Sequence, residues 1–268
     1  MSYWQNRLIK TQEALTKKSE RKVREQLRKY YKTTMEKVLD DFEQTYNKLL
    51  LSIEEGREPT PADLYKLDKY WKAQEQLRAE LRALGEREAV LMSKHFEEHF
   101  FDIYYSFAME SDAAYSTLDV ETAREMLNQI WCADGKSWSE RIWDNVGKLQ
   151  MELNEGLIDC VVAGRSPSQL KKQLMERFGV SLSRADTLVR TEMAHIQTQA
   201  AKRRYEDYGL TFYEILGNND DTCGNHGVDC HKLDGKRFRY TEMVAGKNAP
   251  PFHPNCKCCI VPVVETEI

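Results

Sequence analysis

Apolar residues in the first hundred positions recur at steps of three, four or seven residues, which is the spacing of one helix face. A first stripe starts at Val23, and Gly56 and Pro59 end it. A second stripe follows Thr60-Pro61, where threonine can cap a helix and proline suits its first turn. The pattern predicts two long helices packed antiparallel. Their stripe residues are Val23, Leu27, Tyr31, Val38, Phe42, Tyr46 and Leu49, then Leu67, Tyr70, Leu77, Leu81, Leu84 and Leu91.

The middle of the chain continues the helical pattern. An aromatic run from Phe96 to Phe107 is denser than a lone hairpin needs, so we expect it to join the main core. Helical spacing from Asp134 predicts a helix that ends at Gly164. Ser166-Pro167-Ser168-Gln169 is a capping box for another helix, which the pattern ends at Gly179. A further helix is predicted from residue 183 to Gly209.

The last sixty residues change character. Residues 211–216 and 259–264 are rich in β-branched and aromatic side chains, which favours strands. Between them lies a polar segment with much Gly and Pro. The fold class is therefore mainly α with a small α+β C-terminal domain, and the predicted domains are a helical arm over 1–110 and a second domain over 111–268. The Cys/His segment spans 219–264.

Composition narrows the class of protein. The chain has 268 residues, 31% of them charged, and contains no run of 18 apolar residues and no apolar signal segment, so we expect a soluble protein without membrane contact. Its net charge of −4 divides into +5 over residues 1–50, −11 over 51–160 and +2 over 161–268. The basic arm could dock on an acidic surface or on nucleic acid, although a solvated helix face explains the same charge.

Five of the seven cysteines gather near the C-terminus, which favours a metal site in a reducing compartment over a disulfide framework. A segment this polar cannot fold by apolar burial alone, and thiolates and imidazoles in two separated pairs suit tetrahedral zinc. The sequence therefore predicts one structural zinc ion that joins the two strands' ends. The preferred ligands are Cys223, Cys230, His253 and Cys256; Cys258 can replace one of them, and His226 and His231 are further alternatives.

A second polar feature lies within the last predicted helix. Arg190, Thr191 and Glu192 interrupt its apolar spacing, which suggests a structural polar cluster near the metal segment. The chain has no Gly-rich phosphate loop, no nucleophile elbow and no His-Glu-x-x-His helix, so the sequence gives little support for an enzyme.

Taken in order along the chain, these motifs resemble the phage minor head protein family, also called the phage Mu F-like head morphogenesis family. The resemblance covers about residues 135–265. It is carried by Ser139-Glu140-Arg141-Ile142-Trp143, Gly164 with Ser166, residues 185–192 including Arg190-Thr191-Glu192, Cys223, Cys230, Asp234-Gly235 and Pro250-Pro251-x-His253-Pro254-x-Cys256-Lys257-Cys258.

The resemblance implies a structural minor capsid protein of a tailed phage or prophage. Such a protein is built into the procapsid with the portal protein, beside capsid and scaffold proteins, and in some relatives contacts packaged double-stranded DNA. Its expected location is the virion, with the host cytoplasm during assembly. Cys223, Cys230, His253, Cys256 and Cys258 match the family's presumed metal positions, although the family often has two residues between its first cysteines where this chain has six.

Two other functions stay open from the sequence. A zinc-containing nucleic-acid-binding module could use the basic arm, Lys202-Arg203-Arg204 and Lys236-Arg237-Phe238-Arg239-Tyr240 as phosphate contacts. A metal-dependent nuclease could use His226 or His231 as a base beside an open metal position.

Overall fold

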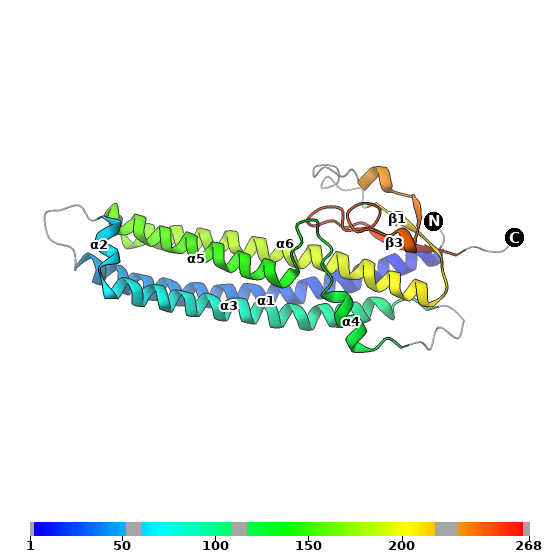
Figure 1. Cartoon of the computed structure of the whole chain (residues 1–268), viewed down its shortest axis with the longest axis horizontal. Helices are drawn as coiled ribbons and strands as arrows, with labels where there is room; N and C mark the ends of the chain where they lie inside the picture. The colour runs from blue at the N-terminus through cyan, green and yellow to red at the C-terminus, as the bar shows by residue number, and fades with distance from the viewer. Residues whose placement is uncertain (1–2, 52–59, 109–116, 218–229, 265–268) are drawn as a thin grey trace. The chain divides into compact units, whose positions relative to one another are not determined.

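The computed structural model describes residues 3–51, 60–108, 117–217 and 230–264. Six α-helices make up most of this part, and three short strands follow (Figure 1). The helices are α1 (Tyr3–Leu50), α2 (Pro61–Tyr65), α3 (Asp68–Tyr104), α4 (Val120–Leu127), α5 (Trp138–Val162) and α6 (Pro167–Asp207). The strands are β1 (Phe212–Leu216), β2 (Arg237–Arg239) and β3 (Cys259–Val263), with 3₁₀ turns η2 (Cys230–Leu233) and η3 (Tyr240–Glu242). The predicted fold class, mainly helical with a small C-terminal sheet, is confirmed.

Packing divides the chain into two compact units. The bundle unit contains residues 25–90 and 139–186, and the sheet unit contains residues 1–24, 91–138 and 187–268. Helices α1, α3 and α6 therefore each contribute to both units. Each unit combines segments from both sides of residue 110. The domain boundary at residue 110 stays a prediction. None of the helices in the described ranges is both long and apolar enough to span a bilayer.

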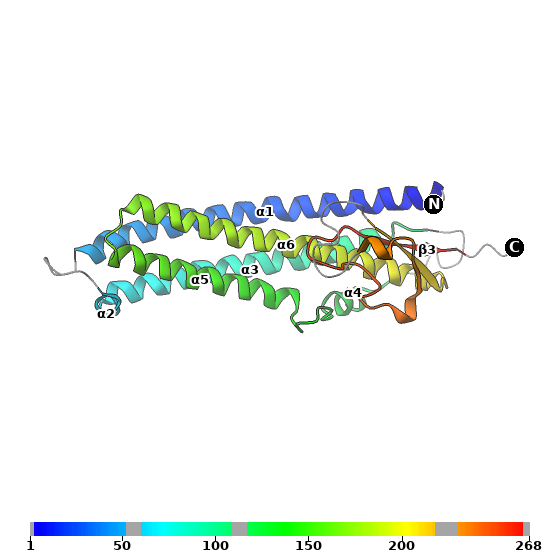
Figure 2. The ribbon, with the colours of Figure 1, turned by 90° about the horizontal axis from the view of Figure 1, so that it is seen from above.

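In the bundle unit four helices run alongside one another (Figures 1 and 2). Tyr31 of α1 contacts Glu88 of α3, and Lys37 pairs with Glu80 at 3.4 Å, so the two helices are antiparallel as predicted. The apolar stripe of the first helix is buried along its length. Its buried members in this unit are Leu27, Tyr31, Val38, Phe42, Tyr46 and Leu49.

Local signals at the helix ends are also as predicted. Ser166 and Gln169 form the capping box, with the Ser166 amide donating to the Gln169 side chain at 2.9 Å. Gly164 closes α5 with φ of 61°, a left-handed conformation in which a side chain would be strained.

The predicted helix end at Gly179 is wrong, because α6 continues through it. The flanking residues Phe178 and Ser181 are buried inside the bundle. Packing of this helix face offsets the glycine's weak helix preference, which amounts to about 1 kcal/mol.

A buried polar layer crosses the bundle, with one residue from each of the four long helices. Asn145 of α5 donates to the Tyr31 hydroxyl at 3.0 Å and to the Ser181 carbonyl of α6 at 3.0 Å. Tyr31 in turn donates to the Glu88 carboxylate at 3.2 Å. Burial of the Glu88 carboxyl raises its pKa to about 7, since water no longer solvates the charged form.

The sheet unit places β1 between β2 and β3, antiparallel to both. The pairing of Phe212 with Val263 and of Leu216 with Cys259 brings the ends of the Cys/His segment together, as predicted. The third strand, β2, was not predicted. It is only three residues long, and its Phe238 packs near Tyr213 with ring centroids 5.9 Å apart.

Candidate metal centre

The first pair of candidate ligands is Cys230 and His253. Cys230 begins η2 and is fully buried, and His253 is buried in the loop before β3. The Cys230 sulfur and the His253 Nε2 atom are 3.7 Å apart. Tetrahedral zinc with Zn–S of about 2.3 Å and Zn–N of about 2.0 Å holds such atoms about 3.5 Å apart. The fold therefore brings a thiol and an imidazole from segments 23 residues apart to the spacing of zinc ligands.

The imidazole of His253 is oriented for metal binding by its own backbone. Its Nδ1 atom lies 2.9 Å from the carbonyl oxygen of Pro254. A carbonyl oxygen can only accept a hydrogen bond, so Nδ1 carries the proton in this contact. In the neutral ring the Nε2 lone pair is then left facing Cys230, which is the arrangement that histidine ligands of zinc adopt.

A tight turn connects His253 to Cys256. The Cys256 amide donates to the His253 carbonyl at 3.1 Å, and Asn255 takes a left-handed φ of 60°. Asparagine tolerates this conformation better than most residues. The Asn255 amide donates to the Thr191 hydroxyl of α6 at 3.2 Å, so the helix holds the turn in place.

Cys256 and Cys258 form the second pair, and both are buried. The Cys258 thiol donates to the Cys256 sulfur and, with the Phe252 and Cys258 amides, lowers the pKa of Cys256 to about 6 against the effect of burial. The thiolate is the form of cysteine that binds metal. None of the six described cysteines is in a disulfide.

The described residues do not complete a shell. Cys223 and His226 lie outside them, and His231 is on the exposed side of η2. Within the described ranges, no three His, Cys, Asp or Glu side chains gather closely enough to hold a metal ion. The donor set nevertheless fits zinc in chemistry, because it offers buried thiols and an imidazole whose Nε2 atom faces one of them. The zinc ion stays a prediction.

Arg190, Thr191 and Glu192 have three different surroundings, as expected for consecutive positions on a helix. Thr191 anchors the turn at Asn255. Glu192 accepts a hydrogen bond from the indole of Trp131 at 3.0 Å, and that indole stacks on His195. No local pattern indicated this role for Trp131, because it reaches α6 from a loop 61 positions away. Arg190 lines a cavity beside the turn.

One arginine in each of the two predicted phosphate-binding clusters already has partners within the sheet unit. Arg204 is buried, donates to the Phe107 carbonyl at 3.0 Å and lies over the rings of Tyr104 and Tyr208, so its prediction as a phosphate contact is wrong. The flanking aromatic rings stabilise this guanidinium where water cannot reach it. Arg237 pairs with Glu214 at 2.8 Å.

Comparison with known proteins gives one family. Residues 151–261 match the family model described as Phage Mu protein F like protein, from within α5 to within β3. The resemblance found in the sequence is confirmed over this range. No curated protein and no solved structure matches the chain.

Proposed function

We propose that the chain is a minor head protein that joins the portal during procapsid assembly, because residues 151–261 match the model of the Phage Mu protein F like family. The family match carries this proposal. The matched segment includes α6, the sheet and the turn that holds His253 and Cys256, so it covers the candidate metal centre together with part of the bundle. Its role is architectural, and its site is the virion.

One zinc ion is part of this proposal. Cys230, His253 and Cys256 would hold it, with Cys223 or Cys258 as the fourth ligand. A bound ion would tie η2 to the turn before β3 and so close the polar segment, where few apolar side chains are available. The Nδ1 contact of His253 with Pro254 and the Thr191 contact with Asn255 support the proposal, since both fix donor groups before any ion binds.

Portal association can be tested by co-expressing the full chain with the portal protein of the same phage. Tagged chain should retain the portal through affinity and size-exclusion chromatography, in a complex larger than the portal alone. The major capsid protein of that phage, expressed with the same tagged chain, provides the comparison for non-specific capture. If the portal elutes separately at micromolar concentrations of both proteins, direct association is excluded.

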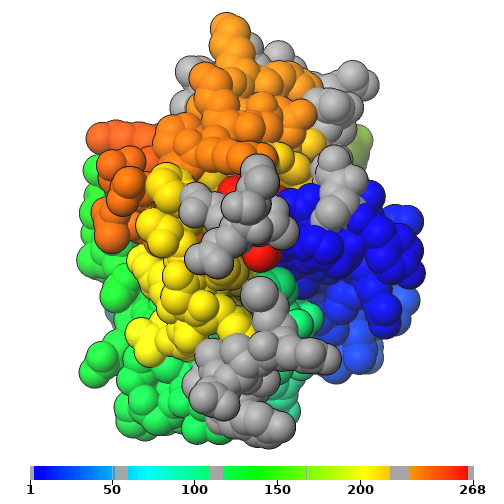
Figure 3. Space-filling model, turned by 90° about the vertical axis from the view of Figure 1, so that its right-hand side faces the viewer, coloured from blue at the N-terminus to red at the C-terminus, as the bar shows by residue number. Residues whose placement is uncertain are grey.

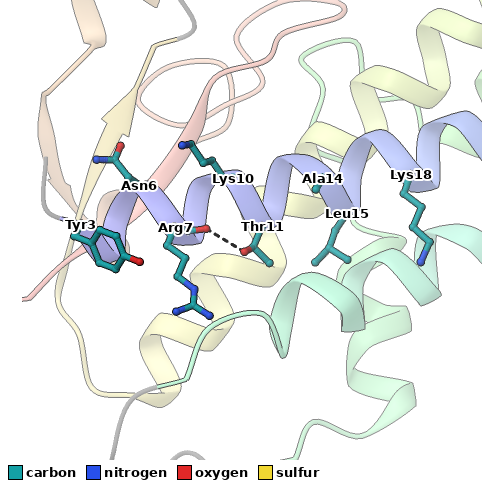
Figure 4. Close-up of a pocket in the computed structure, with 8 residues that line it drawn as sticks. All are labelled: Tyr3, Asn6, Arg7, Lys10, Thr11, Ala14, Leu15 and Lys18. Atoms are coloured by element: carbon teal, nitrogen blue, oxygen red, sulfur yellow. Dashed lines mark hydrogen bonds between the residues drawn. The ribbon is translucent and has the colours of Figure 1, made fainter.

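A second function, contact with packaged DNA, is favoured by one face of α1. Eight residues on successive turns line a shallow groove of about 890 Å³, and none of them is acidic (Figure 4). Arg7 and Lys18 lie on one flank and Lys10 on the other. In the described part of the chain these three make no ion pair, unlike Lys17, which pairs with Glu13 at 3.4 Å. The space-filling view shows the first turns of α1, in blue, at the surface (Figure 3). The groove is lined by Tyr3, Asn6, Arg7, Lys10, Thr11, Ala14, Leu15 and Lys18.

The triple substitution Arg7→Gln, Lys10→Gln and Lys18→Gln should weaken binding to duplex DNA. The slope of log K against log salt is negative, and each phosphate contact that is lost reduces its magnitude by about 0.9. Losing three contacts therefore reduces the magnitude by about 2.7. The slope is measured by fluorescence anisotropy with labelled duplex between about 50 and 200 mM NaCl.

A matched triple variant, Lys66→Gln, Lys69→Gln and Lys72→Gln, removes the same charge from the start of α3 and from its connection to α2. It should leave the slope close to that of the unchanged protein. Equal slopes for both triple variants would show that the α1 face makes no specific contribution.

A further inference from the structure

A cavity of about 340 Å³ opens beside the metal-centre turn in the sheet unit. Its walls come from α1, from α6 and from the segment that leads into β3. All three walls carry polar or charged side chains, and the volume is in the lower range of small-molecule sites, which span about 300–1,000 Å³. The charged lining residues are Glu13, Lys17, Glu20, Arg190 and Lys257.

Two opposite charges face this cavity without meeting. In the part of the chain that the structure describes, neither Glu20 nor Arg190 makes a hydrogen bond or an ion pair. They are nevertheless close enough to interact, because Arg190 is the strongest electrostatic influence that lowers the pKa of Glu20, which burial raises. A half-buried guanidinium has five N–H donors, and in proteins such groups usually have acceptors.

The balance of charge in the cavity is positive. Lys17 is neutralised by its ion pair with Glu13 at 3.4 Å. The lining then carries two further cations, Arg190 and Lys257, and one further acid, Glu20. The side-chain oxygen of Asn255 is buried in the same wall without a hydrogen-bond partner among the described residues. The oxygen and nitrogen of this amide can exchange places, and the amide then offers a donor.

We propose that this cavity binds an oxyanion, a phosphate or carboxylate group, with the Arg190 guanidinium as its main donor and Lys257 as a second cation. The planar fork of arginine matches two oxygen atoms of either group. Glu20 opposes the anion and so limits its affinity. This site needs no bound zinc and does not depend on the role of the chain in head assembly.

The test is isothermal titration of the full chain with inorganic phosphate and, separately, with acetate, at constant ionic strength. The unchanged protein should bind phosphate, acetate or both with millimolar affinity, and the two titrations distinguish the sources of the anion. Arg190→Gln should weaken binding at least about tenfold, as expected for losing a charge-assisted hydrogen bond. Glu20→Gln should strengthen binding, because it removes the repelling carboxylate.

If Arg190→Gln weakens anion binding and Glu20→Gln strengthens it, both side chains act on the bound anion. A merely structural role of Glu20 would not make the Glu20→Gln variant bind the anion more tightly. Arg190→Lys keeps the charge without the fork, so it should bind with intermediate affinity and serves if Arg190→Gln does not fold. Arg177→Gln, at an exposed position of the same helix, is the matched control and should bind as the unchanged protein does. The proposal is overturned if neither anion binds, or if all variants bind with the same affinity.

Discussion

Replacing Cys256 by alanine should release the zinc ion and destabilise the sheet unit. The ion would connect η2 with the turn before β3, so losing one ligand removes the only cross-link we propose for the polar segment. Ligand binding to the native state alone adds about 4 kcal/mol when the free ligand is 1,000 times its Kd. We therefore expect the unfolding free energy of this unit to fall by roughly that amount. Elemental analysis of the purified protein and thermal melting measure the two effects.

Cys132→Ala is the matched control, because Cys132 is a half-buried cysteine of the same unit, in the loop before α5, and is not among the proposed zinc ligands. It should retain one zinc per chain and melt near the temperature of the unchanged protein. A Cys256→Ala protein with a full complement of zinc, or a chain purified without metal and with unchanged melting, would contradict the proposed centre.

Glu88→Gln should make the stability of the bundle unit less dependent on pH. Burial holds the pKa of Glu88 at about 7, above its ordinary value of 4.5. The folded state therefore keeps its proton more tightly than the unfolded state. The stabilisation is complete below pH 4.5 and is lost as pH rises through 7. Between those limits the unchanged protein should lose about 3 kcal/mol of unfolding free energy relative to the glutamine variant.

Urea denaturation of both proteins at about pH 4.5 and pH 8 measures this difference. Glu43→Gln, an exposed acid on α1, provides the control and should leave the pH dependence unchanged. A constant difference between the Glu88→Gln and unchanged proteins at the two pH values would mean that the pKa of Glu88 is the same in the folded and unfolded states, which contradicts this account. Among the described residues, one side-chain oxygen of Glu88 and that of Asn145 have no hydrogen-bond partner. The buried layer therefore lacks hydrogen-bond donors, and a protonated Glu88 carboxyl supplies one.

The helices were predictable because each one buries a single face. The stripe from Val23 to Leu49 is buried at the spacing read from the sequence, and Gly164 ends α5 through a conformation that glycine favours. Both signals act within a few residues of one another. Local spacing and local backbone conformation are the two kinds of information that a sequence carries directly.

What could not be predicted depends on contacts between distant segments. Continuation of α6 through Gly179 follows from packing inside the bundle, which outweighs local preference. Arg204 looks like a phosphate contact beside Lys202 and Arg203, but it lies over the rings of Tyr104, at the end of α3, and Tyr208, just after α6. Strand β2 consists of two exposed arginines on either side of the half-buried Phe238. A pattern of three residues is too short to indicate a strand.

For the candidate centre, the types of ligand residue and their grouping into two separate turns could be predicted from the sequence. As expected, two flanking strands bring the ends of the segment together, and within the segment the Cys230 sulfur lies 3.7 Å from His253 Nε2. The support of the turn by Thr191 was not expected, because a hydroxyl on a long helix gives no sign of which loop it will meet. The cavity at Arg190 likewise depends on three segments far apart in the chain.

Membership of the phage head is tested most directly by mass spectrometry of procapsids and mature heads purified from the phage that encodes this chain. We predict that the protein is present in both, at a few copies for each portal ring, and that it is lost from heads assembled without the portal. Its absence from procapsids and mature heads alike would contradict the proposed function.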